Sequence, residues 1–253
     1  MANTAHTSQA DLKKSNQSFL LPVDQDNSSL TQLVKTYLPK REIDKVWEAY
    51  RFSEKAHSGQ KRRSGEAYIS HPVSVACIAA RFHLDSQSIQ AALLHDVVED
   101  TESTELEIES KFGKQVSTLV TGLSKLDKVE FQDANEAQAE NFRKMLLAMT
   151  QDVRVMLIKL SDRLHNMQTI QSLDERKKIR IAQETVDIYA PIANRLGLNN
   201  LYQELEDLCF EVLHPVRYKT IQKAIKASRG NRKEVIEKIS NEISNKLKSV
   251  KTK

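Results

Sequence analysis

Apolar side chains recur at intervals of three and four residues along most of the 253-residue chain, a spacing typical of amphipathic helices. Only six glycines and five prolines are available to interrupt them, and good helix formers are abundant, so the pattern predicts an all-α fold. The apolar stripes occupy residues 30–37, 43–50, 75–82, 89–93, 106–112, 116–126, 142–149, 153–167, 179–189, 201–212 and 221–225, and a further one follows Gly230.

Two polar stretches lack this periodicity. Residues 1–28 are rich in Ser, Asn, Gln and Thr, which indicates a mobile tail. Residues 127–140 are predicted to form a flexible loop before the helical pattern resumes. Arg143 and Lys144 follow this loop, and a solvated helix face is the simplest interpretation of the two cations.

The segment 91–100 places four ionisable groups at the end of an apolar run. In a helix, His95 and Glu99 are one turn apart, as are Asp96 and Asp100, so the four groups occupy adjacent stripes of one surface. A helix that is apolar all round is normally buried, and buried carboxylates have to be paired, protonated or bound to a cation. The segment therefore predicts a metal site, and a hydrogen-bonded core histidine is the alternative.

A second imidazole is expected at the same place. The loop 60–72 carries three consecutive cations and then delivers His71 and Pro72 to a helix start, where proline is well tolerated. A short turn at residues 84–86, with Ser86 as the predicted cap, joins this helix to the next. So short a connection makes the two helices antiparallel neighbours, which brings His71 opposite His95.

The segment 153–167 is the second apolar run that ends in polar groups. Asp162 and Asn166 are one helical turn apart, so both can face one cavity and Asp162 becomes a further candidate ligand. A structural ion pair between Asp162 and Arg163 is the alternative. His165 is interpreted as a packed core histidine rather than as a ligand.

Composition narrows the function classes. The net charge of +4 is compatible with anionic ligands, but the chain lacks the clear basic stripe of a nucleic-acid-binding protein, so no direct nucleic-acid partner is expected. Cys77 and Cys209 are far apart and form neither a zinc motif nor a disulfide framework, which favours the cytoplasm. No apolar run approaches the roughly twenty residues needed to cross a bilayer, so no membrane partner is expected.

Four segments together resemble the hydrolase half of the RelA/SpoT family of alarmone enzymes. The resemblance runs from about residue 40 to about residue 213 and implies the all-α bundle of the wider HD-phosphohydrolase superfamily. The segments are RRSGEAYISHP at 62–72, LLHDVVEDT at 93–101, KLSDRLHNM at 159–167 and YAPIANRLG at 189–197. One departure is Ala67, where the family commonly has proline, and this affects only the stiffness of the loop.

The resemblance implies an enzyme that removes the 3′-diphosphate of ppGpp or pppGpp, giving GDP or GTP and pyrophosphate, in stringent-response control. The superfamily's metal set matches His71, His95, Asp96 and Asp162, and Mn²⁺ is the usual ion. Two imidazoles with two carboxylates suit Mn²⁺ or Fe²⁺ better than an all-oxygen Mg²⁺ site.

Glu99 and Asp100, the pair that inactive family members have replaced, are expected to orient and deprotonate the attacking water. The loop residues Arg62, Arg63 and Ser64 are expected to bind the nucleotide, because a guanidinium can stack on a base or grip a phosphate. Asn166 and Thr169 are further candidates for substrate contacts. These assignments are the catalytic and substrate-binding part of the predicted site.

The resemblance also suggests a domain organisation. We expect a tail at residues 1–28, a hydrolase domain at 29–213, and a helical extension at 214–253 that starts a linker toward synthetase and regulatory domains of a longer parent chain. Two other functions remain open, a nucleotide-sensing module without turnover and an HD enzyme that acts on another nucleotide. Retention of Glu99 and Asp100 argues against the first, and the Arg62–Gly65 loop against the second.

Overall fold

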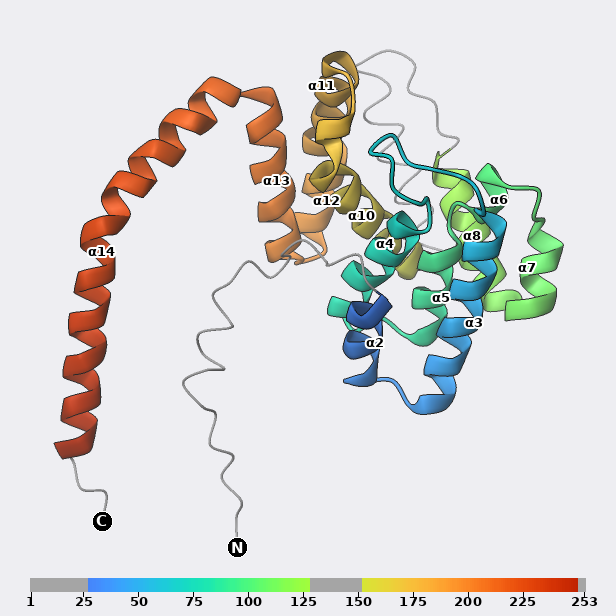
Figure 1. Ribbon diagram of the computed structural model, residues 1–253, viewed down its shortest axis with the longest axis horizontal. Coiled ribbons are helices and arrows are strands. Elements are labelled where there is room, and N and C mark those ends of the chain that lie inside the picture. The colour runs from blue at the N-terminus through green and yellow to red at the C-terminus, as the bar shows by residue number, and fades with distance from the viewer. Residues whose placement is uncertain (1–26, 128–151, 250–253) are drawn as a thin grey trace, which may run out of the picture. The chain divides into compact units, whose positions relative to one another are not determined.

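The computed structural model describes residues 27–127 and 152–249, and within these ranges it is built of helices joined by short turns (Figure 1). No strand occurs in the described part of the chain, where the one isolated antiparallel bridge joins Lys61 to Ala67. The predicted all-α fold is confirmed. The helices are α2 Asn27–Lys35, α3 Lys40–Ala56, α4 Ser70–Arg81, α5 Ser86–Leu94, α6 Val97–Asp100, α7 Glu105–Phe112, α8 Lys114–Asp127, α10 Val153–Gln168, η1 Ile170–Ser172, α11 Glu175–Glu184, η2 Thr185–Tyr189, α12 Ala190–Arg195, α13 Asn199–Leu213 and α14 Pro215–Ser249.

Helix α5 is the centre of the first compact unit, which extends to Cys209. It packs against α3, α4, α8 and α10, and every residue from Ser88 to Leu94 is buried. Helix α4 is buried from His71 to Ala80 and packs against both α5 and α10. The burial predicted for the apolar half of the segment 91–100 is confirmed, since α5 is surrounded by other helices, and α4, for which the pattern indicated one buried side, is buried on all sides from His71 to Ala80.

Local signals explain most helix ends. Thr104 accepts a hydrogen bond from the Glu107 amide at the start of α7, and Gly113 ends that helix at φ 87°. At the start of α5 the cap is Asp85, whose carboxylate accepts from the Ser88 amide at 2.8 Å. The prediction of Ser86 as the cap was wrong by one position, because Ser86 is already the first residue of the helix.

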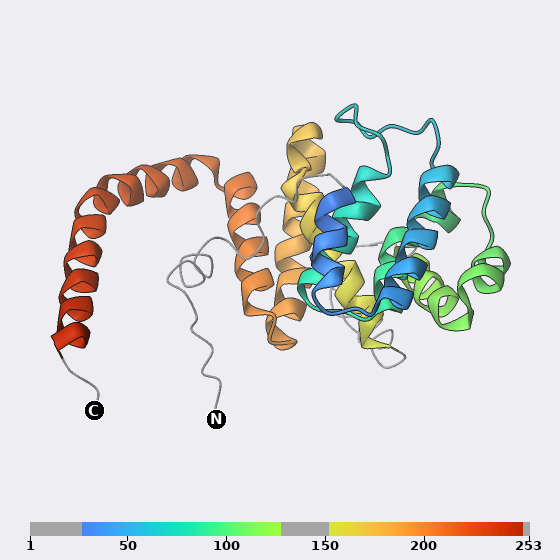
Figure 2. The ribbon, with the colours of Figure 1, turned by 60° about the horizontal axis from the view of Figure 1, so that its bottom comes forward.

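The second compact unit runs from Phe210 and contains α14. This helix continues through Gly230, where the sequence pattern indicated two separate helices, and Figures 1 and 2 both show it curved. Its exposed apolar side chains include Val216, Ile221 and Ile225. The predicted domain boundary between residues 213 and 214 lies close to the division between the units and stays a prediction.

Some sequence predictions fall outside the described residues. They are the tail up to residue 26, most of the loop predicted at 127–140, and the stripe at 142–149 with Arg143 and Lys144. Residues 27 and 28, assigned to the tail, begin α2 instead. None of the described helices combines the length and apolar character needed to cross a membrane.

Truncating one leucine tests the predicted core. Leu119 on α8 is 0% exposed, whereas Leu106 on α7 is 78% exposed. We expect Leu119→Ala to lower the free energy of unfolding by roughly 2–5 kcal/mol, through lost burial and a residual cavity. Leu106→Ala is the matched control, with an expected change within about 0.5 kcal/mol. Urea denaturation with chelator present measures both, and equal losses would contradict the assigned packing.

Candidate metal centre and nucleotide cavity

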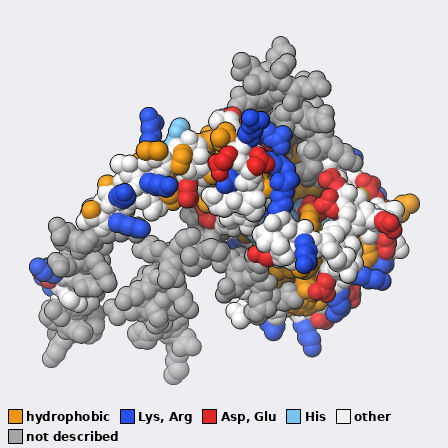
Figure 3. Space-filling view, turned by 45° about the horizontal axis from the view of Figure 1, so that its top comes forward, with side chains coloured by type: hydrophobic (Ala, Val, Ile, Leu, Met, Phe, Trp, Pro, Cys, Tyr) orange, Lys and Arg blue, Asp and Glu red, His pale blue; other side chains and the backbone are white. Residues whose placement is uncertain are grey.

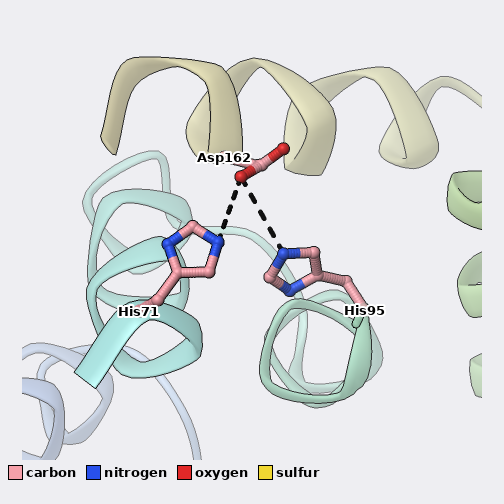
Figure 4. A group of neighbouring side chains, drawn as sticks. All are labelled: His71, His95 and Asp162. Atoms are coloured by element: carbon pink, nitrogen blue, oxygen red, sulfur yellow. Dashed lines mark ion pairs between the residues drawn. The ribbon is translucent and has the colours of Figure 1, made fainter. Parts of the chain in front are cut away.

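Three helical segments bring His71, His95 and Asp162 together, as Figure 4 shows. His71 projects from α4, His95 follows the last residue of α5, and Asp162 projects from α10 above them. Asp162 Oδ1 lies 3.2 Å from His71 Nε2 and 3.9 Å from His95 Nε2. All three residues are buried, and their candidate ligand atoms lie within 4.8 Å of one another.

Asp96 lies beside this cluster. Its Oδ1 is 3.0 Å from His95 Nε2 and its Oδ2 is 3.6 Å from His71 Nε2, so all four predicted ligands converge. The segment 91–100 is not the single helix that the sequence suggested, because α5 ends at Leu94 and α6 begins at Val97. Asp96 has ψ −9°, far from the helical value, and this turn separates the buried imidazole from the exposed Glu99 and Asp100.

The electrostatics of the cluster favour ionised Asp162. Burial alone would raise its pKa, but Lys159, whose Nζ donates to Asp162 Oδ2 at 2.9 Å, together with His71 and His95 holds the pKa well below the usual value. Burial alone would lower the pKa of His95, but the negative charges of Asp96 and Asp162 outweigh the effect of burial and raise this pKa above its usual value. One buried carboxylate, one half-buried carboxylate and two imidazoles thus lie together.

The donor set fits a divalent cation. His95 Nδ1 is hydrogen-bonded to the Ala92 carbonyl oxygen at 2.9 Å, which directs the other ring nitrogen toward the carboxylates. That nitrogen, Nε2, is buried and has no hydrogen-bond partner, although Asp96 lies near it. A buried nitrogen that faces two carboxylates without a hydrogen bond suits a metal ion, which uses the nitrogen lone pair.

A cavity of about 450 Å³ opens from the cluster. It joins the candidate ligands to cations from the loop 60–72. Ser64 is exposed and is not among the lining residues, while Thr169 reaches the site only through a 3.5 Å contact with Arg62 Nη2. The lining residues are Lys61, Arg62, Arg63, Tyr68, His71, Asp96, Glu99, Lys159, Asp162, Asn166, Ser172 and Leu173.

Glu99 and Asp100 lie on the side of a second cavity of about 740 Å³, and Glu99 lines both cavities. Tyr68 connects Asp100 to the candidate ligands, because its hydroxyl lies 2.6 Å from Asp100 Oδ2 and 2.8 Å from Asp96 Oδ2. Burial, together with the charge of Asp96, raises the pKa of Tyr68, so the hydroxyl keeps its proton. The Tyr68 hydroxyl therefore retains a hydrogen that it can donate to the carboxylate of Asp96 or of Asp100.

Sequence reasoning missed Tyr68 and Lys159. Lys159 had a detectable signal, a cation inside an apolar run three residues before Asp162, which is the spacing of a helical ion pair. Tyr68 had none, because its partners Asp96 and Asp100 are 28 and 32 residues away along the chain. Asn166 lines the cavity as predicted, but its amide donates to Asp162 Oδ1 at 2.7 Å.

Comparison with known families matches the HD domain model to residues 49–199. The chain belongs to the HD domain family. It is 56% identical over 219 residues to the bifunctional (p)ppGpp synthase/hydrolase SpoT of Escherichia coli, an alignment that covers 87% of this chain and 31% of the relative. It is 52% identical to the guanosine-3′,5′-bis(diphosphate) 3′-pyrophosphohydrolase of Vibrio cholerae, covering 88% of this chain and 32% of the relative.

These relatives confirm the resemblance drawn from the four segments, and the chain spans about a third of their length. Among solved structures, a metazoan ortholog of SpoT that hydrolyzes ppGpp aligns with a TM-score of 0.51 and 22% identity. The alignment covers 72% of this chain and 98% of that one. At this identity the likeness supports the helical HD fold alone.

Removing one candidate ligand tests the metal centre. We expect His95→Ala to lose stoichiometric divalent metal, because the remaining donors form an incomplete site. Asp162→Asn should lose it too, and it keeps the size of the side chain and an amide oxygen that can still accept a hydrogen bond from Lys159. The exposed His214→Ala is the control. Metal analysis after gel filtration measures all three, and full occupancy in His95→Ala would contradict the assignment.

Proposed function

We propose that this chain hydrolyses ppGpp and pppGpp at the 3′-diphosphate, releasing pyrophosphate and leaving GDP or GTP. The observation that carries the proposal is the cavity of about 450 Å³, which is lined both by the candidate ligands His71, Asp96 and Asp162 and by the cations Lys61, Arg62 and Arg63. Such a cavity offers cations to a phosphate-rich ligand and a metal centre to one phosphoryl group. The names of the relatives from Escherichia coli and Vibrio cholerae support this substrate class.

We propose Mn²⁺ as the ion, held by His71, His95, Asp96 and Asp162. Mixed imidazole and carboxylate donors suit a borderline divalent ion. When bound, such an ion polarises the phosphoryl group and favours ionisation of the attacking water. The chain itself supplies the fixed geometry, because His95 is oriented by the Ala92 carbonyl and Asp162 by Lys159 and Asn166.

Glu99 is assigned as the general base. Its exposed carboxylate lines both cavities, so it can take the proton of a water molecule that approaches the substrate phosphate. Water attacks the phosphorus attached to the 3′ oxygen and forms the new phosphorus–oxygen bond of pyrophosphate, the phosphorus–oxygen bond to the ribose breaks, and the 3′ oxygen takes up the proton that Glu99 removed from the water, so that GDP or GTP leaves with a 3′ hydroxyl. Asp100, held by the Tyr68 hydroxyl, is assigned to orient the water.

Arg62 and Arg63 are assigned to the nucleotide. Both line the cavity, and guanidinium groups form paired hydrogen bonds with phosphates and stack on bases. On the face drawn in Figure 3, acidic and basic side chains are interspersed over the described surface. In the cavity, by contrast, three consecutive cations, Lys61, Arg62 and Arg63, lie close enough together to contact one phosphate-rich ligand. Roles for Ser64, Asn166 and Thr169 in substrate binding, a cytoplasmic location, and synthetase and regulatory domains in a longer parent chain stay predictions.

One assay tests the proposed reaction directly. The purified chain is incubated with ppGpp and Mn²⁺, and pyrophosphate and GDP are measured with and without chelator. We expect equimolar products with metal and none with excess chelator. Binding of ppGpp without turnover would instead support a nucleotide-sensing module, and turnover of other nucleotides in preference to ppGpp would support a different HD phosphohydrolase.

Replacing the proposed base separates chemistry from binding. Glu99→Gln keeps the side-chain shape and removes the proton acceptor, so turnover should fall on the order of a hundredfold or more. Metal content and ppGpp affinity should be retained. Glu109→Gln, an exposed position on α7, is the matched control. Wild-type turnover in Glu99→Gln would eliminate the role as base, and loss of metal would make Glu99 a ligand.

A further inference from the structure

His165 is a buried imidazole that the proposed mechanism does not use. It lies on α10 and is 5% exposed, one turn from the position of Asp162. Its Nδ1 is 2.7 Å from Nδ1 of His71, and the two ring centroids are 4.9 Å apart. The backbone carbonyl of His165 accepts a hydrogen bond from Thr169 Oγ1 at 3.0 Å, which connects His165 to the residue that follows α10.

Arg62 identifies which imidazole donates the proton in this contact. Arg62 Nη1 lies 3.4 Å from the same Nδ1 of His165. A guanidinium can only donate hydrogen bonds, so His165 Nδ1 has to be the acceptor. Since a hydrogen bond between two nitrogens needs one proton, His71 Nδ1 carries the hydrogen and donates it to His165.

The consequence reaches the metal centre. A neutral imidazole with hydrogen on Nδ1 has a lone pair on Nε2. In His71 that atom lies 3.2 Å from Asp162 Oδ1 and 3.6 Å from Asp96 Oδ2, among the other candidate ligand atoms. A hydrogen-bond acceptor on the far side of a ligand imidazole both selects the tautomer and fixes the ring orientation.

We infer that His165 is a positioning residue, which accepts the Nδ1 hydrogen of His71 and so presents His71 Nε2 to the metal. This inference rests on the metal site of the proposed function and adds a residue to it. His165 acts in its neutral form with hydrogen on Nε2.

The inference also couples the substrate loop to the metal centre. Arg62 and His71 approach the same nitrogen of His165, at 3.4 Å and 2.7 Å. Arg62 comes from the loop that supplies cations to the cavity, and His71 begins the helix that follows it. One nitrogen of His165 thus links Arg62, a proposed nucleotide-binding side chain, to His71, a proposed ligand.

Two substitutions of His165 distinguish the effect of the hydrogen-bond acceptor from the effect of side-chain volume. His165→Phe fills the space without an acceptor, and His165→Asn places an amide oxygen close to the position of Nδ1. Loss of an outer hydrogen-bond partner of a ligand histidine typically weakens metal binding by about 10–100-fold. We expect this loss in the Mn²⁺ affinity of His165→Phe, measured by calorimetry, and recovery to within about threefold of wild type in His165→Asn.

The exposed His214→Phe controls for the same chemical change, and circular dichroism confirms that each variant is folded. Wild-type Mn²⁺ affinity in a folded His165→Phe would overturn the inference. Equal weakening in His165→Phe and His165→Asn would overturn it too, because packing rather than the acceptor would then be at work. A wild-type chain that binds Mn²⁺ without hydrolysing ppGpp would instead overturn the proposed function and leave the role of His165 standing.

Discussion

The ionised carboxylate of Asp162 imposes the main constraint on this fold. A carboxylate so deeply buried is tolerated only with compensating charge and hydrogen bonds, and here Lys159 and Asn166 each donate one. Both donors lie on α10 within one turn of Asp162, so the helix carries its own compensation into the core. The two candidate ligand imidazoles come from α4 and from the residue that follows α5, and both of these helices pack against α10.

The site has two electrostatic sides, and the division suits phosphate hydrolysis. Lys61, Arg62 and Arg63 line only the cavity of about 450 Å³, whereas Asp100 lines only the cavity of about 740 Å³ and Glu99 lines both. Cations outnumber carboxylates in the lining of the first cavity, and carboxylates outnumber Lys55 and Lys111 in the lining of the second, so a phosphate-rich ligand is favoured in the first. Carboxylates in direct contact with the phosphates of the substrate would weaken its binding. Carboxylates in the neighbouring cavity avoid this contact and leave room for water. The break between α5 and α6 lies between the buried His95 and the exposed pair Glu99 and Asp100.

The sequence predicted those parts of the site that depend on local spacing. The short turn after α4 made it possible to place His71 opposite His95, and the apolar runs indicated that both would be buried. Contacts between distant segments could not be obtained in this way. The pairing of His71 with His165 spans 94 residues, and nothing in periodicity selects it. The break at residues 95–96 was also missed. His95 has helical backbone angles, and only the ψ of Asp96 departs from the helical value, so the run of helical hydrogen bonds is interrupted without a glycine or proline to mark the place in the sequence.

The segment 189–197 belongs to the resemblance although it supplies none of the candidate ligands, and its contact with Arg163 gives it a structural role. The ion pair suggested as an alternative for Asp162 is not made with Arg163, which binds Glu184 at 3.0 Å and lies 4.0 Å from the ring centroid of Tyr189. A desolvated contact between a guanidinium and an aromatic ring contributes about 2 kcal/mol. Adjacent residues of α10 therefore point to different partners, Asp162 to the imidazoles and Arg163 to η2. The contacts of Arg163 with Glu184 and Tyr189 thus hold α10 against α11 and η2, while the adjacent Asp162 faces His71 and His95.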